Sequence, residues 1–127
     1  MERAETLGIK KFIKWVGKRG KITDTSRDGV GYDFKVKWHK MRLIETYEVK
    51  GSSKTHKIPD MSIREFNNKG ILKADWLFVV GNVNKKGKEV IYKIPRKAIK
   101  KDNLKLKQAY HIAKFQNKKT MSHYELI

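Results

Sequence analysis

Three residues near the middle of the chain have the types and spacing of a metal-dependent hydrolytic site. A Gly-Tyr-Asp string at 31–33 supplies an aspartate, and a Glu-Val-Lys-Gly string at 48–51 supplies a glutamate and a lysine. Two carboxylates can hold a divalent metal, and a neighbouring lysine can help to activate water. Either string alone is a weak signal, because an acid two residues before a lysine is common in half-exposed strands. Together they suggest hydrolysis by metal-activated water.

The reaction that fits these residues is phosphodiester hydrolysis assisted by Mg²⁺. It needs a nucleophilic water, stabilisation of a crowded negative transition state and help for the leaving oxygen. Mg²⁺ commonly takes one or two carboxylates with several waters. Asp33 and Glu48 match that demand, and the carbonyl of Val49 is a third candidate ligand. Lys50 would orient the attacking water and stabilise developing charge. In the alternative, structural interpretation, Glu48 and Lys50 form a surface ion pair and Asp33 belongs to a turn.

Two strands joined by a short turn are expected to bring the three side chains together. Apolar and polar residues alternate along 32–38 and along 43–50, where Glu48 and Lys50 share one face. The four residues between these segments have the length of a hairpin turn, so the strands should be antiparallel partners. Asp33 then lies near the other two residues, although the pattern leaves open the register that would set it across from Lys50.

A helix is predicted over 2–18, before these strands. Apolar residues recur there at helical spacing, at Ile9, Phe12, Ile13 and Val16. Glu5 lies one turn earlier on the same face, which would point its carboxylate toward the sheet. The alternative for Glu5 is an ordinary first-turn glutamate that interacts favourably with the helix dipole.

The rest of the chain predicts an α/β fold around a buried strand. The continuous apolar run 76–80 suits a strand buried on both faces, which in a small domain means helices on both sides of a sheet. A further strand is expected over 89–94 and a helix around 108–115. A capping-box pattern predicts a short helix over 62–70, and the polar composition of 23–29 suits a loop.

Length and charge define the class of protein and of partner. The 127 residues fit one domain, and the 39% hydrophobic content argues against disorder. The net charge is +18, from 31 Lys and Arg against 13 Asp and Glu, and it is spread along the chain. Such a surface suits a polyanion, because neutralising phosphates releases counterions. Nucleic acid is therefore the expected partner.

Several other classes are disfavoured by what the sequence lacks. No stretch approaches the roughly 20 apolar residues that span a bilayer, and the N-terminus does not resemble a secretion signal. We therefore expect a soluble, intracellular (cytoplasmic) protein that does not use a membrane. The absence of cysteine excludes disulfides, thiolate zinc sites and a cysteine nucleophile. The four histidines lack the paired spacing of zinc ligands.

The order of these elements resembles the PD-(D/E)XK nuclease superfamily. A helix with an inward glutamate, a loop, the Gly-Tyr-Asp strand, the Glu-Val-Lys-Gly strand, a capped helix and a buried strand follow one another over roughly 3–96. The chain looks most like the small members that carry these two strings, many of them found near restriction or defence functions. Tyr32 stands where many members of the superfamily have proline, as is usual in this subgroup.

The resemblance implies a restriction endonuclease-like core, a mixed central sheet flanked by helices, as one nuclease-like domain over 1–127. It implies that Asp33, Glu48 and Lys50 are catalytic, that Asp33 and Glu48 bind the metal, and that Glu5 is an auxiliary metal-site acid. The expected cofactor is Mg²⁺, with Mn²⁺ able to replace it. The expected activity is that of an endonuclease acting on DNA, as a homodimer or within a larger defence or repair assembly.

Further residues are expected to grip the phosphates that flank the scissile bond. They lie on the first strand or just after the second, at Lys35, Lys37, Ser52, Ser53, Lys54 and Lys57. Trp15, Trp38 and Trp76 lie in apolar patterns and are expected in the core rather than as base-stacking platforms. Two alternatives to the nuclease remain: a non-catalytic basic nucleic-acid-binding module of the same fold, and a basic structural protein of a ribonucleoprotein.

Overall fold

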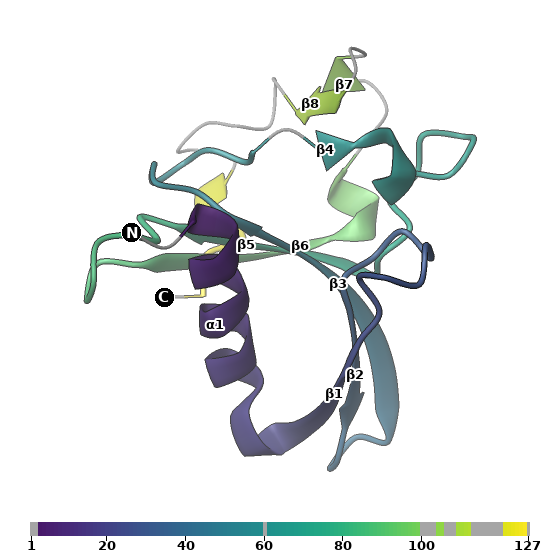
Figure 1. The fold of residues 1–127 in the computed structure, drawn as a ribbon, viewed down its shortest axis with the longest axis horizontal. Helices are drawn as coiled ribbons and strands as arrows, with labels where there is room; N and C mark the ends of the chain where they lie inside the picture. Colours follow the sequence, from purple (N-terminus) through teal and green to yellow (C-terminus); the bar gives the residue numbers. More distant parts are fainter. Residues whose placement is uncertain (1–2, 60, 100–103, 106–108, 113–120, 127) are drawn as a thin grey trace.

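The computed structural model describes residues 3–59, 61–99, 104–105, 109–112 and 121–126. Its centre is a five-stranded mixed sheet in the order β1-β2-β3-β5-β6. Neighbours pair antiparallel except β3 and β5, which are parallel. The sheet is strongly twisted, and β5 and β6 run across the direction of β1 and β2 (Figure 1). The strands are β1 (Gly20–Asp24), β2 (Phe34–Trp38), β3 (Leu43–Gly51), β5 (Trp76–Gly81) and β6 (Val90–Pro95).

One α-helix, α1 (Ala4–Val16), packs on one face of this sheet (Figure 1). The predicted helix is thereby confirmed, with an earlier end followed by the 3₁₀ turn η1 (Gly17–Arg19). Phe12 is fully buried and its ring meets Phe34 and Phe78 at centroid distances of 5.2 and 5.0 Å. The expected apolar stripe is wrong in one position, because Ile13 is 48% exposed. The buried face follows the i, i+4 row through Phe12, and Ile13 lies beside that row.

Among the described residues, the opposite face of the sheet is covered mainly by short strands, 3₁₀ turns and irregular segments. It holds a core of buried side chains from the segment after β3, from β5 and β6, and from the C-terminal segment: Ile58, Met61, Phe66, Leu72, Leu77, Val79, Tyr92, Ile94 and Met121. The covering elements described are β4 (Met61–Ser62) and the 3₁₀ turns η2 (Ile63–Glu65) and η3 (Arg96–Ala98). β4 pairs with β8 (Ala109–Ile112), which also pairs with β7 (Leu104–Lys105). Within the described residues, this face carries short strands, 3₁₀ turns and the two helical residues Met121 and Ser122, so the expected helices on both faces are not shown.

The short helix expected over 62–70 ends after one 3₁₀ turn. The side chain of Asn67 accepts hydrogen bonds from the N–H groups of Lys69 and Ile71, and the Asn67 N–H donates to the Ile71 carbonyl. Phe66 then bridges to Leu72. An asparagine that bonds nearby backbone groups offers the chain a turn in place of the next helical turn. This local competition explains why the capping pattern did not lead to an α-helix.

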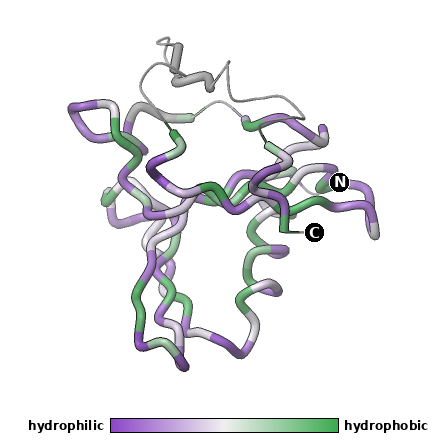
Figure 2. The backbone as a smooth tube through the Cα atoms, turned by 180° about the vertical axis from the view of Figure 1, so that it is seen from behind, coloured by the Kyte–Doolittle hydropathy of each residue, from purple (hydrophilic) through white to green (hydrophobic). Residues whose placement is uncertain are grey.

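The strand predictions are largely confirmed. β2 and β3 form the expected hairpin, β5 is buried on both faces, and β6 covers the predicted 89–94 segment. The loop expected over 23–29 is wrong at its start, because β1 continues to Asp24. The helix expected around 108–115 is wrong where it can be assessed, since Ala109–Ile112 is a strand and the rest of that segment lies outside the described residues. Apolar residues concentrate in the central strands and polar residues in the turns (Figure 2).

Candidate active site

The outer end of the β2–β3 ladder brings Asp33 to Glu48. Phe34 pairs with Tyr47 in this ladder, and the N–H of Asp33 donates to the carbonyl of Tyr47 at 3.0 Å. One step further along the antiparallel register, Asp33 lies beside Glu48. The register that the sequence left open therefore sets Asp33 next to Glu48 rather than across from Lys50.

The carboxylate of Asp33 is fixed by the backbone of β3. Its Oδ2 accepts a hydrogen bond from the N–H of Val49 at 3.0 Å. The N–H and C=O of one strand residue point to the same edge, so the Val49 carbonyl faces this side as well. Val49 lines the same hollow as Asp33 and Glu48. The residue predicted to offer a carbonyl ligand is thus next to both predicted carboxylate ligands.

The glycine of the Gly-Tyr-Asp string lets the chain turn into this position. Gly31 has a φ of 89°, a backbone conformation that residues other than glycine rarely adopt. A Cβ at Gly31 would collide with the side chain of Lys73 and with the carbonyl of Arg64. Lys73 and Arg64 line the hollow around Asp33 and Glu48. These two cations carry no sequence signal that links them to Asp33 and Glu48, and the fold alone brings them to the site.

Glu48 and Lys50 lie on one side of β3, as alternation predicts, and a third acid meets them there. Glu48 is only 3% exposed. The Lys50 Nζ lies 3.4 Å from Glu48 Oε1 and 2.7 Å from Glu65 Oε1. Glu65 ends the 3₁₀ turn η2 on the far side of the hollow. The capping-box pattern places Glu65 in a helix cap, and its separation of 15 residues from Lys50 follows no local periodicity that would indicate the contact.

Two adjoining hollows, of about 260 and 280 Å³, open onto these side chains. Both are lined by Asp33, Glu48 and Glu65. We call the combined hollow the acidic cleft, and its acidic and catalytic candidates are Glu5, Asp33, Glu48, Lys50 and Glu65. The three residues expected to be catalytic thus face one solvent-accessible space.

Glu5 reaches the acidic cleft because α1 approaches β3 very closely. Gly8 of the helix lies against Gly51 at the end of the strand, and a Cβ on Gly8 would be 3.0 Å from the Gly51 Cα. A Cβ on Gly51 would overlap the carbonyl oxygen of Ala4. Glu5 is exposed and lines the cleft beside Lys50. Gly8, which weakens the helix by about 1 kcal/mol relative to alanine, allows the close contact that places Glu5.

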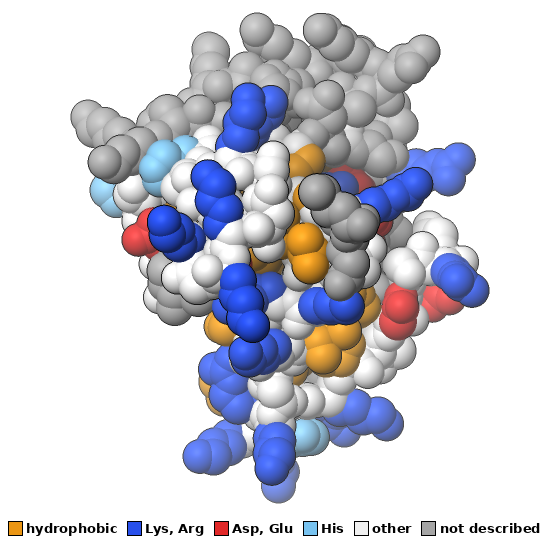
Figure 3. Space-filling model, turned by 60° about the vertical axis from the view of Figure 1, so that its left-hand side comes forward, with side chains coloured by type: hydrophobic (Ala, Val, Ile, Leu, Met, Phe, Trp, Pro, Cys, Tyr) orange, Lys and Arg blue, Asp and Glu red, His pale blue; other side chains and the backbone are white. Residues whose placement is uncertain are grey.

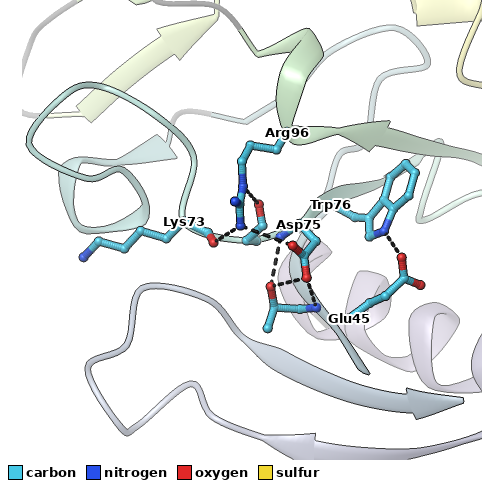
Figure 4. A network of polar contacts seen from close by, with 7 residues as sticks. Glu45, Lys73, Asp75, Trp76 and Arg96 are labelled. Atoms are coloured by element: carbon cyan, nitrogen blue, oxygen red, sulfur yellow. Dashed lines mark hydrogen bonds and ion pairs between the residues drawn. The ribbon is translucent and has the colours of Figure 1, made fainter. Parts of the chain in front are cut away.

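A polar network at the start of β5 keeps β3 in place two residues before Glu48. The N–H and hydroxyl of Thr46 donate to Asp75 Oδ2 at 2.8 and 3.0 Å, and the Asp75 N–H donates to the Thr46 hydroxyl at 2.9 Å. Arg96 donates to Asp75 and to the Lys73 carbonyl (Figure 4). These bonds tie β3 to β5 at the point where their parallel ladder begins. They fix the position of β3 relative to β5, and with it the position of Glu48 in the cleft.

The acidic cleft crowds several carboxyl groups around Glu48 and Lys50, while Lys73 and Arg64 also line it. Burial raises the pKa of Glu48 well above its ordinary value, and the charges of Glu65 and Asp33 raise it further. Burial acts to lower the pKa of Lys50, but Glu65 and Glu48 outweigh that effect and raise it. Lys50 therefore holds its proton firmly, with Glu65 as its strongest partner, and Glu48 holds its own proton more tightly than an ordinary glutamate. A buried acid crowded by other acids is typical of functional sites.

The donor atoms of the acidic cleft fit Mg²⁺ with a sparse set of protein ligands. Within the described residues, no group of three or more His, Cys, Asp or Glu side chains is arranged to hold a metal ion. Asp33 and Glu48 supply two carboxylates, and Val49 adds a carbonyl at the same edge. Mg²⁺ is commonly bound by one or two carboxylates, with water and substrate phosphate completing its shell. The carboxyl groups crowded around Glu48 would lose less free energy on ionising if a divalent cation lay between them.

The residues expected to grip flanking phosphates lie outside the acidic cleft. Lys35 and Lys37 are exposed on β2, and neither lines the two hollows. Ser52 is buried, and its hydroxyl accepts from the N–H of Lys54 at 3.1 Å. The others, Ser53, Lys54 and Lys57, are exposed in the segment after β3. Lys and Arg side chains are spread over the face shown in Figure 3, with few acids among them.

Comparisons with known proteins identify a family but no activity. The family model described as Protein NO VEIN, C-terminal, matches residues 4–94, which include every residue of the acidic cleft named above. Searches of curated proteins and of solved structures gave no significant match. In the described part of the chain, no helix has both the length and the apolar character required to cross a bilayer. Because the matched segment is well over half of the 127 residues, the chain belongs to the family of the NO VEIN C-terminal domain.

Proposed function

We propose that this protein is a Mg²⁺-dependent endonuclease, with a restriction endonuclease-like core, that hydrolyses phosphodiester bonds in DNA. The observation that carries the proposal is the convergence of Asp33, Glu48 and Lys50 on one accessible cleft, with Glu48 buried among other acids. Burying a carboxylate near two others costs stability, because each disfavours the charged form of its neighbours. A cation bound among these carboxylates would offset this cost.

Each residue of the acidic cleft has a defined task in this proposal. Asp33, anchored by the Val49 N–H, and Glu48, held by burial, would be the metal ligands. When bound, Mg²⁺ would supply Lewis acidity, neutralising phosphate charge and making water a better nucleophile. Lys50 would orient the attacking water and stabilise the charge that develops on the phosphate. Glu65, 2.7 Å from the Lys50 Nζ, would hold that ammonium in position.

The basic surface supports nucleic acid as the substrate class. The net charge of +18 is spread along the chain, and lysines and arginines cover much of the face shown in Figure 3, so a polyanion would meet many cations. Lys73 and Arg64 line the cleft itself and are suited to contact the phosphates next to the scissile bond. Lys35, Lys37 and the segment after β3 would contact the strand further away.

The second candidate function is a non-catalytic nucleic-acid-binding module of the same fold. The favouring observation is that Lys50 is already paired with Glu65 and Glu48 inside the protein, so the cluster can also serve as an internal ion-pair network. This alternative keeps the basic surface and its affinity for phosphate. It predicts binding without turnover.

The two candidates are separated by incubating the protein with plasmid, linear and branched DNA and with RNA. Each substrate is tested with Mg²⁺, with Mn²⁺ and with EDTA. The nuclease proposal predicts cleavage of at least one DNA substrate with either metal and none with EDTA. Binding of all substrates with no cleavage under any metal would favour the non-catalytic module. RNA cleavage without DNA cleavage would correct the substrate but keep the nuclease.

A further inference from the structure

A second hollow, of about 470 Å³, combines aromatic walls with a positively charged rim. It lies where the C-terminal end of α1 meets the turn between β2 and β3, and Trp15 and Trp38 are among its lining residues. None of its lining residues lines the acidic cleft. Its volume is in the range of pockets that hold small organic ligands. We call it the tryptophan pocket.

The flat surface that the tryptophan pocket offers for stacking is the exposed guanidinium of Arg19, which is backed by the half-buried Trp15 and by Trp38, only 5% exposed in the core as expected. The Trp15 and Trp38 rings meet nearly edge to face, with centroids 5.6 Å apart. The guanidinium of Arg19 lies over both rings, its Cζ 4.9 Å from the Trp15 centroid and 5.4 Å from that of Trp38. Arg19 is held there by donating to the backbone carbonyls of Trp15 and Val16. Aromatic rings and arginine planes are the groups on which proteins stack unpaired nucleobases.

Glu45 supplies a fixed hydrogen-bond acceptor to the same pocket. Its Oε1 accepts from the Trp38 indole at 2.7 Å and from the Tyr47 hydroxyl at 3.2 Å, and its Oε2 accepts from the Trp76 indole at 2.5 Å (Figure 4 shows the last of these). An ionised carboxylate has about four acceptor positions. Three donors from the protein thus orient Glu45 and leave it capacity for an amino or imino group of a base, as carboxylates use to recognise bases.

Cations complete the lining. Lys18, Lys40 and Lys93 line the pocket together with Arg19. Lys18 and Lys40 are exposed at its rim, whereas the Lys93 Nζ lies 4.0 Å from the Trp76 ring centroid. Stacking surfaces, one acceptor and several cations together match a ligand that has an aromatic base and a phosphate.

We propose that the tryptophan pocket binds a nucleotide, its base stacked on the Arg19 guanidinium that Trp15 and Trp38 support, and its phosphate held by Lys18 and Lys40. The base would donate from an amino or imino group to Glu45. The nucleotide can be free or an unpaired nucleotide of a strand, since both present the same chemistry. This inference does not rest on the nuclease proposal, because the two sites share no lining residue.

The test is a titration of the full chain that follows its intrinsic tryptophan fluorescence, in EDTA so that cleavage plays no part. The ligands are AMP, GMP, CMP and UMP, a short single-stranded oligonucleotide, its duplex, and ribose 5-phosphate as the base-free control. We expect saturable quenching by at least one mononucleotide or by the single strand, and none by ribose 5-phosphate. Quenching by the single strand alone would assign the site to strands, and quenching by mononucleotides would assign it to free nucleotides as well.

Variants connect the signal to the pocket. Arg19→Ala and Lys40→Ala should each weaken binding about tenfold, in line with the loss of one stacking or phosphate contact. Lys86→Ala, which removes an exposed lysine from the turn after β5, should leave it unchanged. Glu45→Gln should change the ranking of the four bases. The proposal is overturned if no ligand quenches saturably, if ribose 5-phosphate quenches equally, or if Arg19→Ala and Lys40→Ala both bind like Lys86→Ala.

Discussion

At the scale of single residues, Glu48 is the most costly feature of the acidic cleft. It is 3% exposed and lies close to Asp33 and Glu65, with Lys50 as the compensating charge. Its raised pKa means that the folded chain holds this proton more tightly than the unfolded chain. Stability should therefore fall as pH rises above the ordinary carboxyl value of 4.5. The buried, crowded Glu48 carboxyl therefore lowers the stability of the metal-free protein at neutral pH.

Glu48→Gln should accordingly raise the melting temperature in EDTA at pH 8 and remove part of the loss of stability between about pH 5 and pH 8. Mg²⁺ should then stabilise the wild-type protein, since it binds the folded state, and should leave Glu48→Gln unchanged. Thermal unfolding followed by circular dichroism measures both effects. Glu89→Gln is the control, because Glu89 lies away from the cleft, where backbone N–H groups, Lys11 at 3.8 Å and Lys14 lower its pKa, so its replacement should not raise the melting temperature. A destabilised Glu48→Gln protein would contradict this account of the charge.

Glu65 is predicted to act through Lys50 as a positioning residue. Glu65→Gln removes the nearest carboxylate to the Lys50 Nζ and so should lower the pKa of that lysine. We expect cleavage to persist at a reduced rate, with the alkaline limb of its pH profile moved to lower pH. Lys50→Ala should abolish cleavage at every pH. A Glu65→Gln profile that keeps the wild-type shape would show that Glu65 does not act on Lys50.

The proximity of Asp33, Glu48 and Lys50 could be predicted from the sequence because hairpin geometry and strand alternation are local. Glu65, Lys73 and Arg64 could not be found in this way. They reach the cleft through the irregular segment after β4, whose course depends on contacts such as the Asn67 turn and the Phe66–Leu72 bridge. Such contacts have no periodicity that a sequence pattern can reveal.

At the scale of elements, the contact between α1 and the end of β3 is what places Glu5 at the cleft. The two backbones meet at Gly8 and Gly51, and a side chain on Gly51 would overlap the carbonyl oxygen of Ala4. The strand itself was predictable from alternation. The closeness of the helix was not, because the glycine in the helix appears in the sequence only as a weak helix former.

Gly51→Ala should therefore destabilise the protein by about 1–3 kcal/mol, the usual cost of forcing an extra group into a packed contact. Chemical denaturation measures this change. Gly8→Ala is the comparison: its Cβ meets the Gly51 Cα at 3.0 Å, a milder conflict that the better helix propensity of alanine partly offsets. We expect the smaller loss for Gly8→Ala. Equal stability of Gly51→Ala and wild type would mean that the helix does not pack this closely.

The sheet was easier to predict than what covers it. The hairpin could be predicted from the alternation of apolar and polar residues, and the buried strand β5 from one continuous apolar run. The strand β6 was also expected from the sequence. A buried run requires a cover on each face, but it does not say of what kind. On the face opposite α1, turns and short strands exclude water from Leu77, Val79 and Ile94 as an α-helix would.

At the scale of the whole molecule, the +18 charge dominates the expected behaviour. Affinity for DNA should fall steeply as salt rises, because each phosphate contact releases condensed counterions. A mobility-shift titration between about 50 and 200 mM salt, the range over which such contacts weaken markedly, measures the slope. Asp33→Asn should bind as well as or better than wild type, since it removes a negative charge beside the path of the strand. Affinity that does not change with salt would contradict a phosphate-dominated interface.

The most direct test of the central claim is cleavage with the metal controlled during the reaction. Wild-type protein, Glu48→Gln and Glu89→Gln are followed on one DNA substrate in Mg²⁺, and EDTA and then excess Mg²⁺ are added in turn. We expect wild type and Glu89→Gln to cut the DNA, to stop when EDTA is added and to resume with excess Mg²⁺. We expect Glu48→Gln to bind the DNA without cutting it. Cleavage by Glu48→Gln at the wild-type rate, or by wild type in EDTA, would contradict the central claim.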